Sequence, residues 1–119
     1  MAVTTEYKVA VSVDWYMYVV AGEGEPGASP TRLHTPRGLA LDPSGSHIFV
    51  AEEGNDRITR WSTRPGGQGQ VAAGGRGRGD GPHQLNGPRG VGIADDGVLF
   101  VADHHNNRVM AWRRGATED

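Results

Sequence analysis

The hydrophobic positions of this chain form short clusters separated by Gly, Pro and Asp, a pattern typical of short β-strands joined by turns. The predicted strands fall into two matching sets: Gly38–Asp42, His47–Glu52, Arg57–Trp61 and Gln70–Ala73, then Gly90–Ala94, Val98–Asp103 and Arg108–Trp112. Turns are predicted at Pro43-Ser44-Gly45 and at Asp95-Asp96-Gly97. No segment has a helical period over three turns, so the pattern predicts an all-β fold.

The second strand of each set is apolar on both faces, as Ile48-Phe49-Val50-Ala51 and Leu99-Phe100-Val101-Ala102 show. A strand that is apolar on both faces is normally covered on both faces. We therefore expect each of these strands to belong to a sheet that has further protein on either side.

The two sets are copies of one internal repeat. Leu33–Leu41 aligns with Leu85–Ile93, and Asn55–Trp61 aligns with Asn106–Trp112 after the loss of one residue near Ser46. Such a loss in a turn leaves the flanking strands intact.

The repeat also extends backwards, because Val20-Ala21-Gly22 echoes Ala72-Ala73-Gly74. The chain is therefore divided into an N-terminal extension at 1–15, an orphan strand at 16–21, a full unit at about 33–73 and most of a further unit at 85–119.

Each unit reads Pro-x-Gly-apolar-x-apolar, a turn, apolar-Phe-Val-Ala-Asp/Glu, and then Asn-x-Arg-Ile/Val. This combination, over roughly residues 18–115, resembles the NHL repeat. The resemblance implies a β-propeller, whose four-stranded antiparallel blades surround a central channel; here the fragment holds about two blades. The matching positions are Pro36, Gly38, Glu52, Asn55, Arg57 and Trp61, with Pro88, Gly90, Asp103, Asn106, Arg108 and Trp112.

The resemblance also implies roles for these residues. The acid that ends the second strand and the Arg that opens the third are expected to link neighbouring elements by charge-assisted hydrogen bonds. Asn55 and Asn106 are expected to turn the chain, because Asn tolerates the left-handed conformation. Trp61 and Trp112 are expected to pack in the core or between blades.

Two blades cannot close a ring of about four to eight, so apolar faces are expected to be exposed. One solution is a ring of several copies, in which the orphan strand of one copy completes the last blade of the next. The other is that the chain is an ordered piece of a longer polypeptide or packs on another subunit. The sequence differences between the units favour the second solution. In neither case do we expect the isolated chain to be a stable monomer.

Composition narrows the function. The net charge of −2 lacks the basic excess of a typical nucleic-acid binder. Without cysteine there is no disulfide or thiolate metal site, and no stretch is long and apolar enough to span a bilayer. No cofactor, metal or enzymatic activity is predicted, and no compartment is assigned.

Two motifs in the sequence resemble ligand-binding motifs. Gly22–Gly27 fits G-x-G-x-x-G, but no helix follows and two Glu residues would repel phosphate, so an inter-blade loop is favoured. The run Gly75-Arg76-Gly77-Arg78-Gly79 keeps an RNA-binding surface as the alternative function, with Arg37, Arg89, Arg113 and Arg114 as contributors.

The histidines give weaker signals. In an extended segment the adjacent side chains of His104 and His105, beside Asp103, point to opposite sides and cannot easily bind one metal ion. The other three histidines, His34, His47 and His83, lack the sequence spacing of metal ligands. A metal-dependent lyase-like propeller is therefore the least supported of the three functions considered for this sequence. The pair Asp95-Asp96 is explained by its turn.

The N-terminal segment departs most from the repeat and is rich in aromatic residues. We expect Trp15, Tyr16 and Tyr18 to contact a protein partner. The sequence thus predicts a non-catalytic structural or protein-interaction module, an accessory or scaffold subunit whose protein partners cover the open blade faces.

Overall fold

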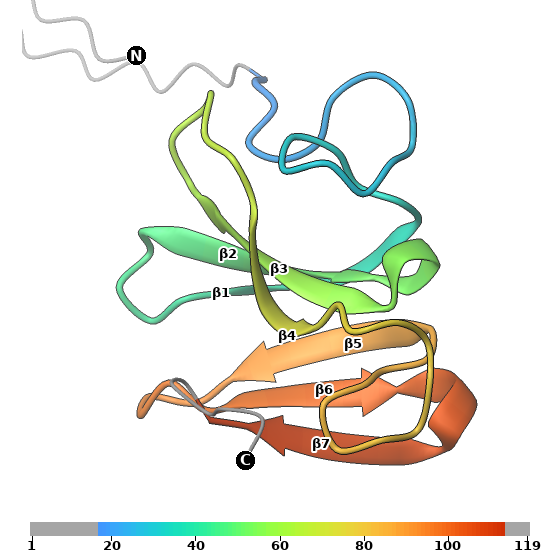
Figure 1. Cartoon of the computed structure of the whole chain (residues 1–119). Helices are drawn as coiled ribbons and strands as arrows, with labels where there is room; N and C mark the ends of the chain where they lie inside the picture. Colours follow the sequence, from blue (N-terminus) through green and yellow to red (C-terminus); the bar gives the residue numbers. More distant parts are fainter. Residues whose placement is uncertain (1–16, 114–119) are drawn as a thin grey trace, which may run out of the picture.

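The computed structural model describes residues 17–113, which form two antiparallel sheets packed against each other (Figure 1). The first sheet, called blade 1, has the strand order β1 (Pro36–Leu41), β2 (His47–Glu52), β3 (Arg57–Ser62) and β4 (Gln70–Gly74). The second, blade 2, has the order β5 (Pro88–Ile93), β6 (Leu99–Asp103) and β7 (Arg108–Trp112). Short 3₁₀ turns, η1 (Glu53–Asn55) and η2 (His104–Asn106), join the second and third strands of each blade. The predicted all-β propeller fragment is confirmed.

The first strand of each blade begins two residues earlier than predicted. Pro36 pairs with Glu52, and Pro88 pairs with Asp103, in each case across a β-bulge that ends at a Gly. Proline has no N–H to donate to the neighbouring strand, and a bulge is a position where a strand tolerates this. The pairing can therefore continue to the 3₁₀ turn. The other strands agree with the prediction to within one residue at each end.

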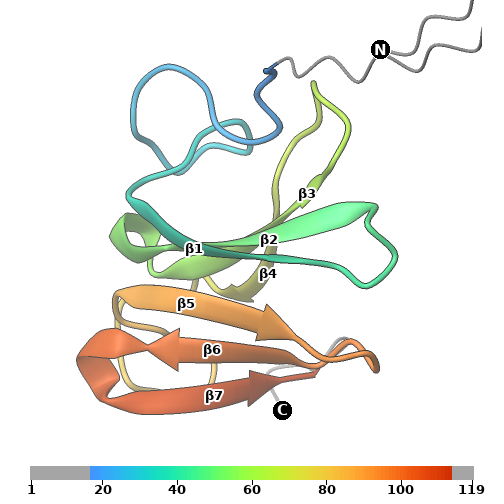
Figure 2. The ribbon, with the colours of Figure 1, turned by 180° about the vertical axis from the view of Figure 1, so that it is seen from behind.

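The orphan strand predicted at 16–21 is not formed. Residues 17–21 belong to no strand, and Tyr16 lies outside the described residues. The segment from 17 to 35 instead runs irregularly over blade 1 (Figures 1 and 2). A strand needs a neighbour for its backbone hydrogen bonds, and residues 17–21 pair with none of the described strands.

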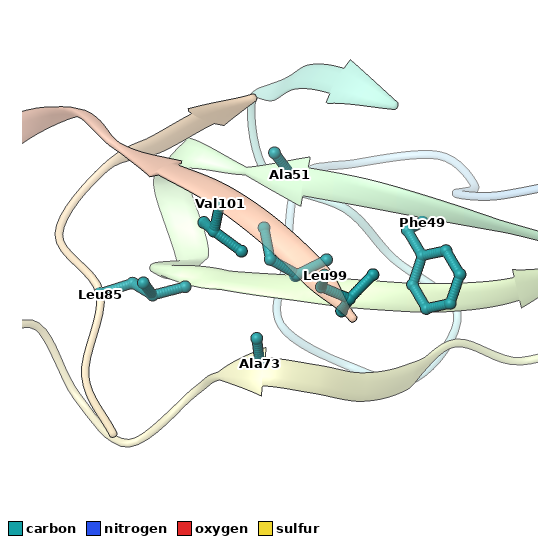
Figure 3. Close-up of a cluster of buried hydrophobic side chains, with 7 residues drawn as sticks. Phe49, Ala51, Ala73, Leu85, Leu99 and Val101 are labelled. Carbon is teal, nitrogen blue, oxygen red and sulfur yellow. The ribbon is translucent and has the colours of Figure 1, made fainter. Parts of the chain in front are cut away.

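The hydrophobic core lies between the two blades (Figure 3). Blade 2 supplies Leu99 and Val101, and the loop between the blades supplies Leu85. The contributions of blade 1 are Phe49, Ala51, Ile58 and Ala73. The strand β5 packs against both β1 and β2, so the blades meet along their first strands.

The second strands differ in burial. The prediction of cover on both faces is wrong for β6, and the expected exposure of apolar end faces is observed instead. The last four residues of β2, from Phe49 on, are buried whichever face they point to, as predicted, whereas β6 alternates between buried and exposed residues. Phe100 is 46 % exposed, while its counterpart Phe49 is only 7 % exposed. The physical reason is that nothing in the described chain covers the second face of blade 2.

The repeat offers a matched pair of substitutions for testing this packing. Ile58 is fully buried and its counterpart Val109 is 70 % exposed. We predict that Ile58→Ala lowers the free energy of unfolding by about 2–5 kcal/mol, through lost burial and a residual cavity. Val109→Ala in the monomer should change it by less than about 1 kcal/mol. Equal losses in urea unfolding would contradict the packing described.

Candidate functional site

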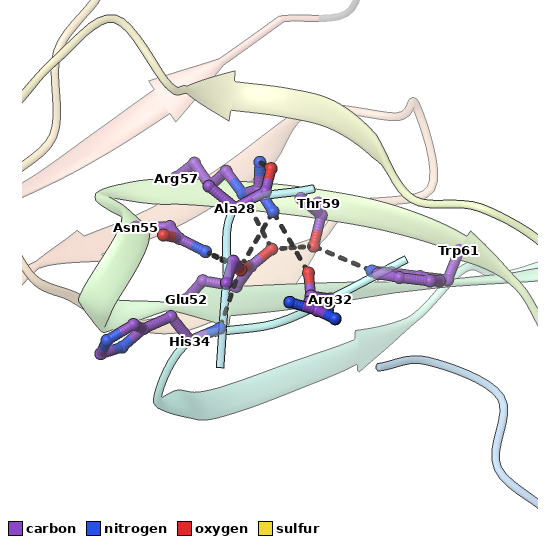
Figure 4. A network of polar contacts seen from close by, with 9 residues as sticks. Ala28, Arg32, His34, Glu52, Asn55, Arg57, Thr59 and Trp61 are labelled. Carbon is purple, nitrogen blue, oxygen red and sulfur yellow. Dashed lines mark hydrogen bonds and ion pairs between the residues drawn. The ribbon is translucent and has the colours of Figure 1, made fainter. Parts of the chain in front are cut away.

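A buried carboxylate organises blade 1 (Figure 4). Glu52 at the end of β2 has no exposed surface. Its Oε2 accepts hydrogen bonds from Arg57 Nε at 3.0 Å and Thr59 Oγ1 at 2.6 Å. Its Oε1 accepts from Asn55 Nδ2 at 2.7 Å, from the second guanidinium nitrogen of Arg57 at 3.2 Å, and from the backbone N–H of His34 at 3.3 Å. A buried charge is tolerable only with such pairing.

The same donors tie an irregular loop to the blade. Arg57 donates to the carbonyl oxygens of Ala28 and Arg32, at 3.1 and 3.3 Å. Asn55 donates to the carbonyl oxygen of Gly27 at 2.9 Å. The loop from 27 to 34 therefore lies over the face of blade 1 that points away from blade 2, and its position depends on Glu52.

Blade 2 repeats this arrangement around Asp103, which is also fully buried. Its Oδ2 accepts from Asn106 Nδ2 and Arg108 Nε, both at 2.8 Å. Its Oδ1 accepts from the backbone N–H of Asn86 at 2.7 Å. The acid, Asn and Arg of the repeat thus form one network in each unit.

Arg108 and Asn106 also hold the equivalent loop between the blades. Asn106 donates to the carbonyl oxygen of Gly79 at 2.8 Å. Arg108 donates at 2.9–3.1 Å to the carbonyl oxygens of Asp80, Gly81 and Gln84. These contacts place the loop from 79 to 86 against blade 2 as residues 27–34 lie against blade 1.

The two networks differ by one methylene and two hydrogen bonds, one of which comes from the second guanidinium nitrogen of Arg57. The longer Glu52 takes an extra hydrogen bond from Thr59, whose Oγ1 in turn accepts from Trp61 Nε1 at 2.9 Å. The shorter Asp103 has Met110 at the place of Thr59. In both units the buried polar groups are satisfied, because no buried side-chain polar atom of the described residues lacks a hydrogen-bond partner.

The chain reversal after each 3₁₀ turn corrects one prediction. The left-handed residue is not Asn55 or Asn106 but the next one, Asp56 with φ 52° and Asn107 with φ 51°. The preceding Asn side chain is engaged by the carboxylate network instead. Asp and Asn both tolerate this conformation.

Asp56 joins the two blades. Its Oδ1 accepts from the backbone N–H of Gly87 at 2.8 Å, and its Oδ2 accepts from Arg78 Nε at 3.2 Å. Its counterpart Asn107 in blade 2 is exposed. Sequence reasoning missed this role, because Asp56 lies between two more prominent repeat positions.

Glu53 forms a second link between the blades. It makes ion pairs with Arg37 of β1 and with Arg89 of β5. The hydrogen bond from Arg89, together with the charges of both Arg residues, lowers the pKa of Glu53 below its ordinary value, against a smaller opposing effect of burial. Arg37 and Arg89, which were candidate residues of an RNA-binding surface in the sequence, are therefore engaged in an ion-pair bridge between the blades.

A glycine permits the close approach of the first strands. A Cβ at Gly38 would lie 2.7 Å from the carbonyl oxygen of Arg89 and 3.0 Å from the Cα of Gly90, so β1 can meet β5 only without a side chain there. A Cβ at Gly90 would meet only the Cβ of Ala102, at 3.5 Å. Gly90 therefore faces open space where Gly38 faces the next blade.

The open face of blade 2 is formed by the outward side chains of its strands: Phe100, Ala102, Val109 and Ala111. Three of these are the counterparts of Phe49, Ala51 and Ile58, which are buried between the blades. Beside this face, β7 pairs with β6 on one side only within the described residues. We call these two features the open face and the free edge.

The histidines do not gather. His47 contacts Ser46 and Arg60, His83 lies edge-on to Trp112, and His34 contacts Thr35. Across residues 17–113, no three His, Asp or Glu side chains are placed as a metal site requires. A polar hollow of about 470 Å³ at the blade junction has His34, His105 and Arg78 among its lining, but Arg78 is already paired with Asp56.

The remaining motifs have structural places. Asp95 and Asp96 lie in the turn after β5, where Asp96 caps the backbone N–H of Val98 at 3.2 Å. Gly22 and Gly24 have positive φ in an irregular loop with no helix after it. Trp61 is 2 % exposed, and Trp112 packs against the inter-blade core.

The predicted aromatic contact surface is only partly described. Tyr18 is 54 % exposed, and Trp15 and Tyr16 lie outside the described residues. Within residues 17–113 no helix has the length and hydropathy needed to cross a membrane.

The buried carboxylate gives the first test of the site. Glu52→Ala leaves the Arg57 charge unpaired in the interior, so we predict a loss of about 3–5 kcal/mol in the free energy of unfolding. Glu23→Ala, at an exposed position, is the control and should change it by less than about 0.5 kcal/mol. Similar unfolding midpoints for the two variants would show that the network does not organise the blade.

A backbone position gives the second test. Thr35 has φ 51° where the repeat has Gly87 with φ 63°. This conformation costs a side-chain-bearing residue roughly 1–2 kcal/mol, whereas Gly costs roughly 0.5–1 kcal/mol of chain entropy. Thr35→Gly should therefore stabilise the chain by up to about 1 kcal/mol in denaturant unfolding.

The reverse change supplies the contrast. Gly87→Thr should be clearly destabilising, because a β-branched residue is strained at φ 63° and its Cβ would also press on the His105 ring. If Thr35→Gly lowered stability instead, the left-handed conformation at Thr35 would be refuted.

The comparisons with known proteins agree with this geometry. The family model described as the NHL repeat matches residues 85–110, which hold β5, β6, η2 and the start of β7. No curated protein matches the chain significantly. The matched segment contains the second carboxylate network, so residues 85–110 are an NHL repeat within this β-propeller fragment.

Proposed function

We propose that this chain is a non-catalytic protein-interaction module, acting as an accessory or scaffold subunit of a larger assembly. The observation that carries the proposal is the open face of blade 2. It presents Phe100, 46 % exposed, and Val109, 70 % exposed, in the pattern that is buried between the blades elsewhere in the molecule. Contiguous apolar surface of this kind marks interaction sites in soluble proteins.

The free edge supports the same function. Beside the open face, the outer backbone groups of β7 have no strand partner among the described residues. An exposed strand edge accepts an added strand from another polypeptide. An apolar face and an adjacent free edge together suit a protein partner, which supplies both side chains and a backbone.

The alternative of an RNA surface has less support. Arg37 and Arg89 are paired with Glu53, and Arg78 of the Gly-Arg loop is paired with Asp56. Each of these ion pairs offsets the positive charge that a phosphate would need. The lyase-like alternative needs His ligands converging on one point, whereas no three His, Asp or Glu side chains of the described residues are placed to hold a metal ion.

Site-specific photo-crosslinking tests the proposal. A benzoylphenylalanine at Val109 in the full chain, expressed in cells, should give a discrete crosslinked protein band. The same group at Arg64, in the exposed turn after β3, is the control and should give none. Equal crosslinking at the two positions, or none at Val109, would count against an interaction function for this face.

A further inference from the structure

We propose that the partner of the open face is a second copy of this chain, bound head to tail. In this arrangement the outer face of blade 1 in one copy covers the open face of blade 2 in the next. The segment Tyr18–Gly22 of the first copy adds to β7 of the second as a fourth strand. The inference rests on the proposed function and names its partner.

The chain carries both halves of the interface, and its internal junction is the precedent. Blade 2 packs Val91 and Ile93 against blade 1. Their counterparts on the outer face of blade 1 are Leu39 and Leu41, which are 68 % and 57 % exposed. Each exposed face therefore repeats one side of a contact that the molecule already makes.

The segment Tyr18–Gly22 is the counterpart of β4, and it is already held like a fourth strand at its end. Gly22 has φ 84° and its counterpart Gly74 has φ 68°. A Cβ at Gly22 would press on Leu33 at 3.2 Å, as one at Gly74 would press on Leu85 at 2.8 Å. The loop after each segment is fixed by its own carboxylate network. Among the described strands, β4 has β3 beside it, whereas residues 19–22 pair with none.

The internal pairing predicts the register of this added strand. Arg57 lies opposite Gly74, Ile58 opposite Ala73 and Thr59 opposite Val71 in the β3–β4 ladder. Transferred to the repeat, Gly22 lies opposite Arg108, Ala21 opposite Val109 and Val19 opposite Met110. Val19 is 68 % exposed in the single chain, and this pairing gives it a neighbour.

Charge is matched at the junction. Inside the chain, Asp56 accepts from Gly87 N–H and pairs with Arg78. Between copies, Asn107 replaces the acid and Pro26 stands at the counterpart of Arg78. The ionic contact is thus replaced by a neutral one on both sides, and no buried charge is left alone.

A second ionic link is lost between copies. His104 occupies the counterpart of Glu53, so the bridge to the Arg of the next blade is absent. We therefore expect the contact between copies to be weaker than the internal junction, and the assembly to depend on concentration. A repeated head-to-tail contact closes into a ring when its rotation permits, and two to four copies would supply about four to eight blades.

Gly90 gives the sharpest support. In the single chain, a Cβ at Gly90 meets only Ala102, at ordinary contact distance, and its φ is not in the left-handed region. Nothing in the described residues requires a glycine there. A further blade would require it, because Gly38 at the same position has the next blade's backbone at 2.7 Å.

Gly92 provides the matched control. It lies on the same strand and on the same face as Gly90, also with open space around its Cβ position. Its counterpart at the internal junction is Ala40, which shows that a methyl group fits at that place between two blades. Gly90→Ala and Gly92→Ala are therefore the same chemical change, and only one of them blocks docking.

Sedimentation velocity of the full chain over a range of concentrations tests the proposal. The unchanged chain and Gly92→Ala should associate into a defined oligomer, and Gly90→Ala should weaken association by about tenfold or more. The core lies between the two blades of one chain, so, against the expectation from the sequence that the isolated chain is unstable, circular dichroism should show the Gly90→Ala monomer folded. Val109→Arg, a charge on the open face, should also give a folded monomer.

The contrary outcomes are distinct. A chain that stays monomeric throughout, or equal association of the two glycine variants, overturns assembly from copies. Crosslinking of Val109 to a different protein would in that case leave the proposed function standing. If the chain also gave no crosslink at Val109, both the assembly from copies and the proposed interaction function would be contradicted.

Discussion

The buried carboxylate at the end of each second strand is the constraint on which the rest of the structure depends. A carboxylate with no exposed surface, as Glu52 and Asp103 are, must be fully paired. The pairing recruits the Arg and Asn of the same unit, and these donors bind the carbonyl oxygens of the preceding loop. One buried charge thereby fixes the loop that covers one face of the blade.

The same contacts also determine on which side of a blade the next blade packs. The loop fixed by Asp103 crosses from blade 1 to blade 2, where Asp56 and Glu53 reach across the junction. The same geometry exists at the far side of blade 2, with Asn107 and Gly90 at the equivalent positions and no blade in the described chain to meet them. The open face therefore repeats the surface that blade 1 buries against blade 2, and this exposure is the observation that supports the proposed interaction function.

Much of the fold could be predicted from the sequence, because turn residues and apolar runs recur at matched positions in two units. Burial of β6 was wrongly predicted, since periodicity shows which faces are apolar but not whether a neighbour covers them, as the exposed Phe100 illustrates. Residues 17–21 form no strand in the single chain, because none of the described strands pairs with them. The roles of Asp56 and Glu53 could not be foreseen, because they depend on how the two blades meet. The position of Gly38 was found from the repeat, but its need for close backbone approach came only from the structure.

The most direct test of the central claim is amide hydrogen exchange along β7 at low and high protein concentration. The account predicts that amides on the free edge, between Arg108 and Trp112, exchange rapidly in the dilute chain and become protected on association, together with amides of Tyr18–Gly22. Protection of both segments in the same concentration range would show a strand added at this edge. Rapid exchange of the β7 edge at every concentration, or protection of β7 without Tyr18–Gly22, would contradict it.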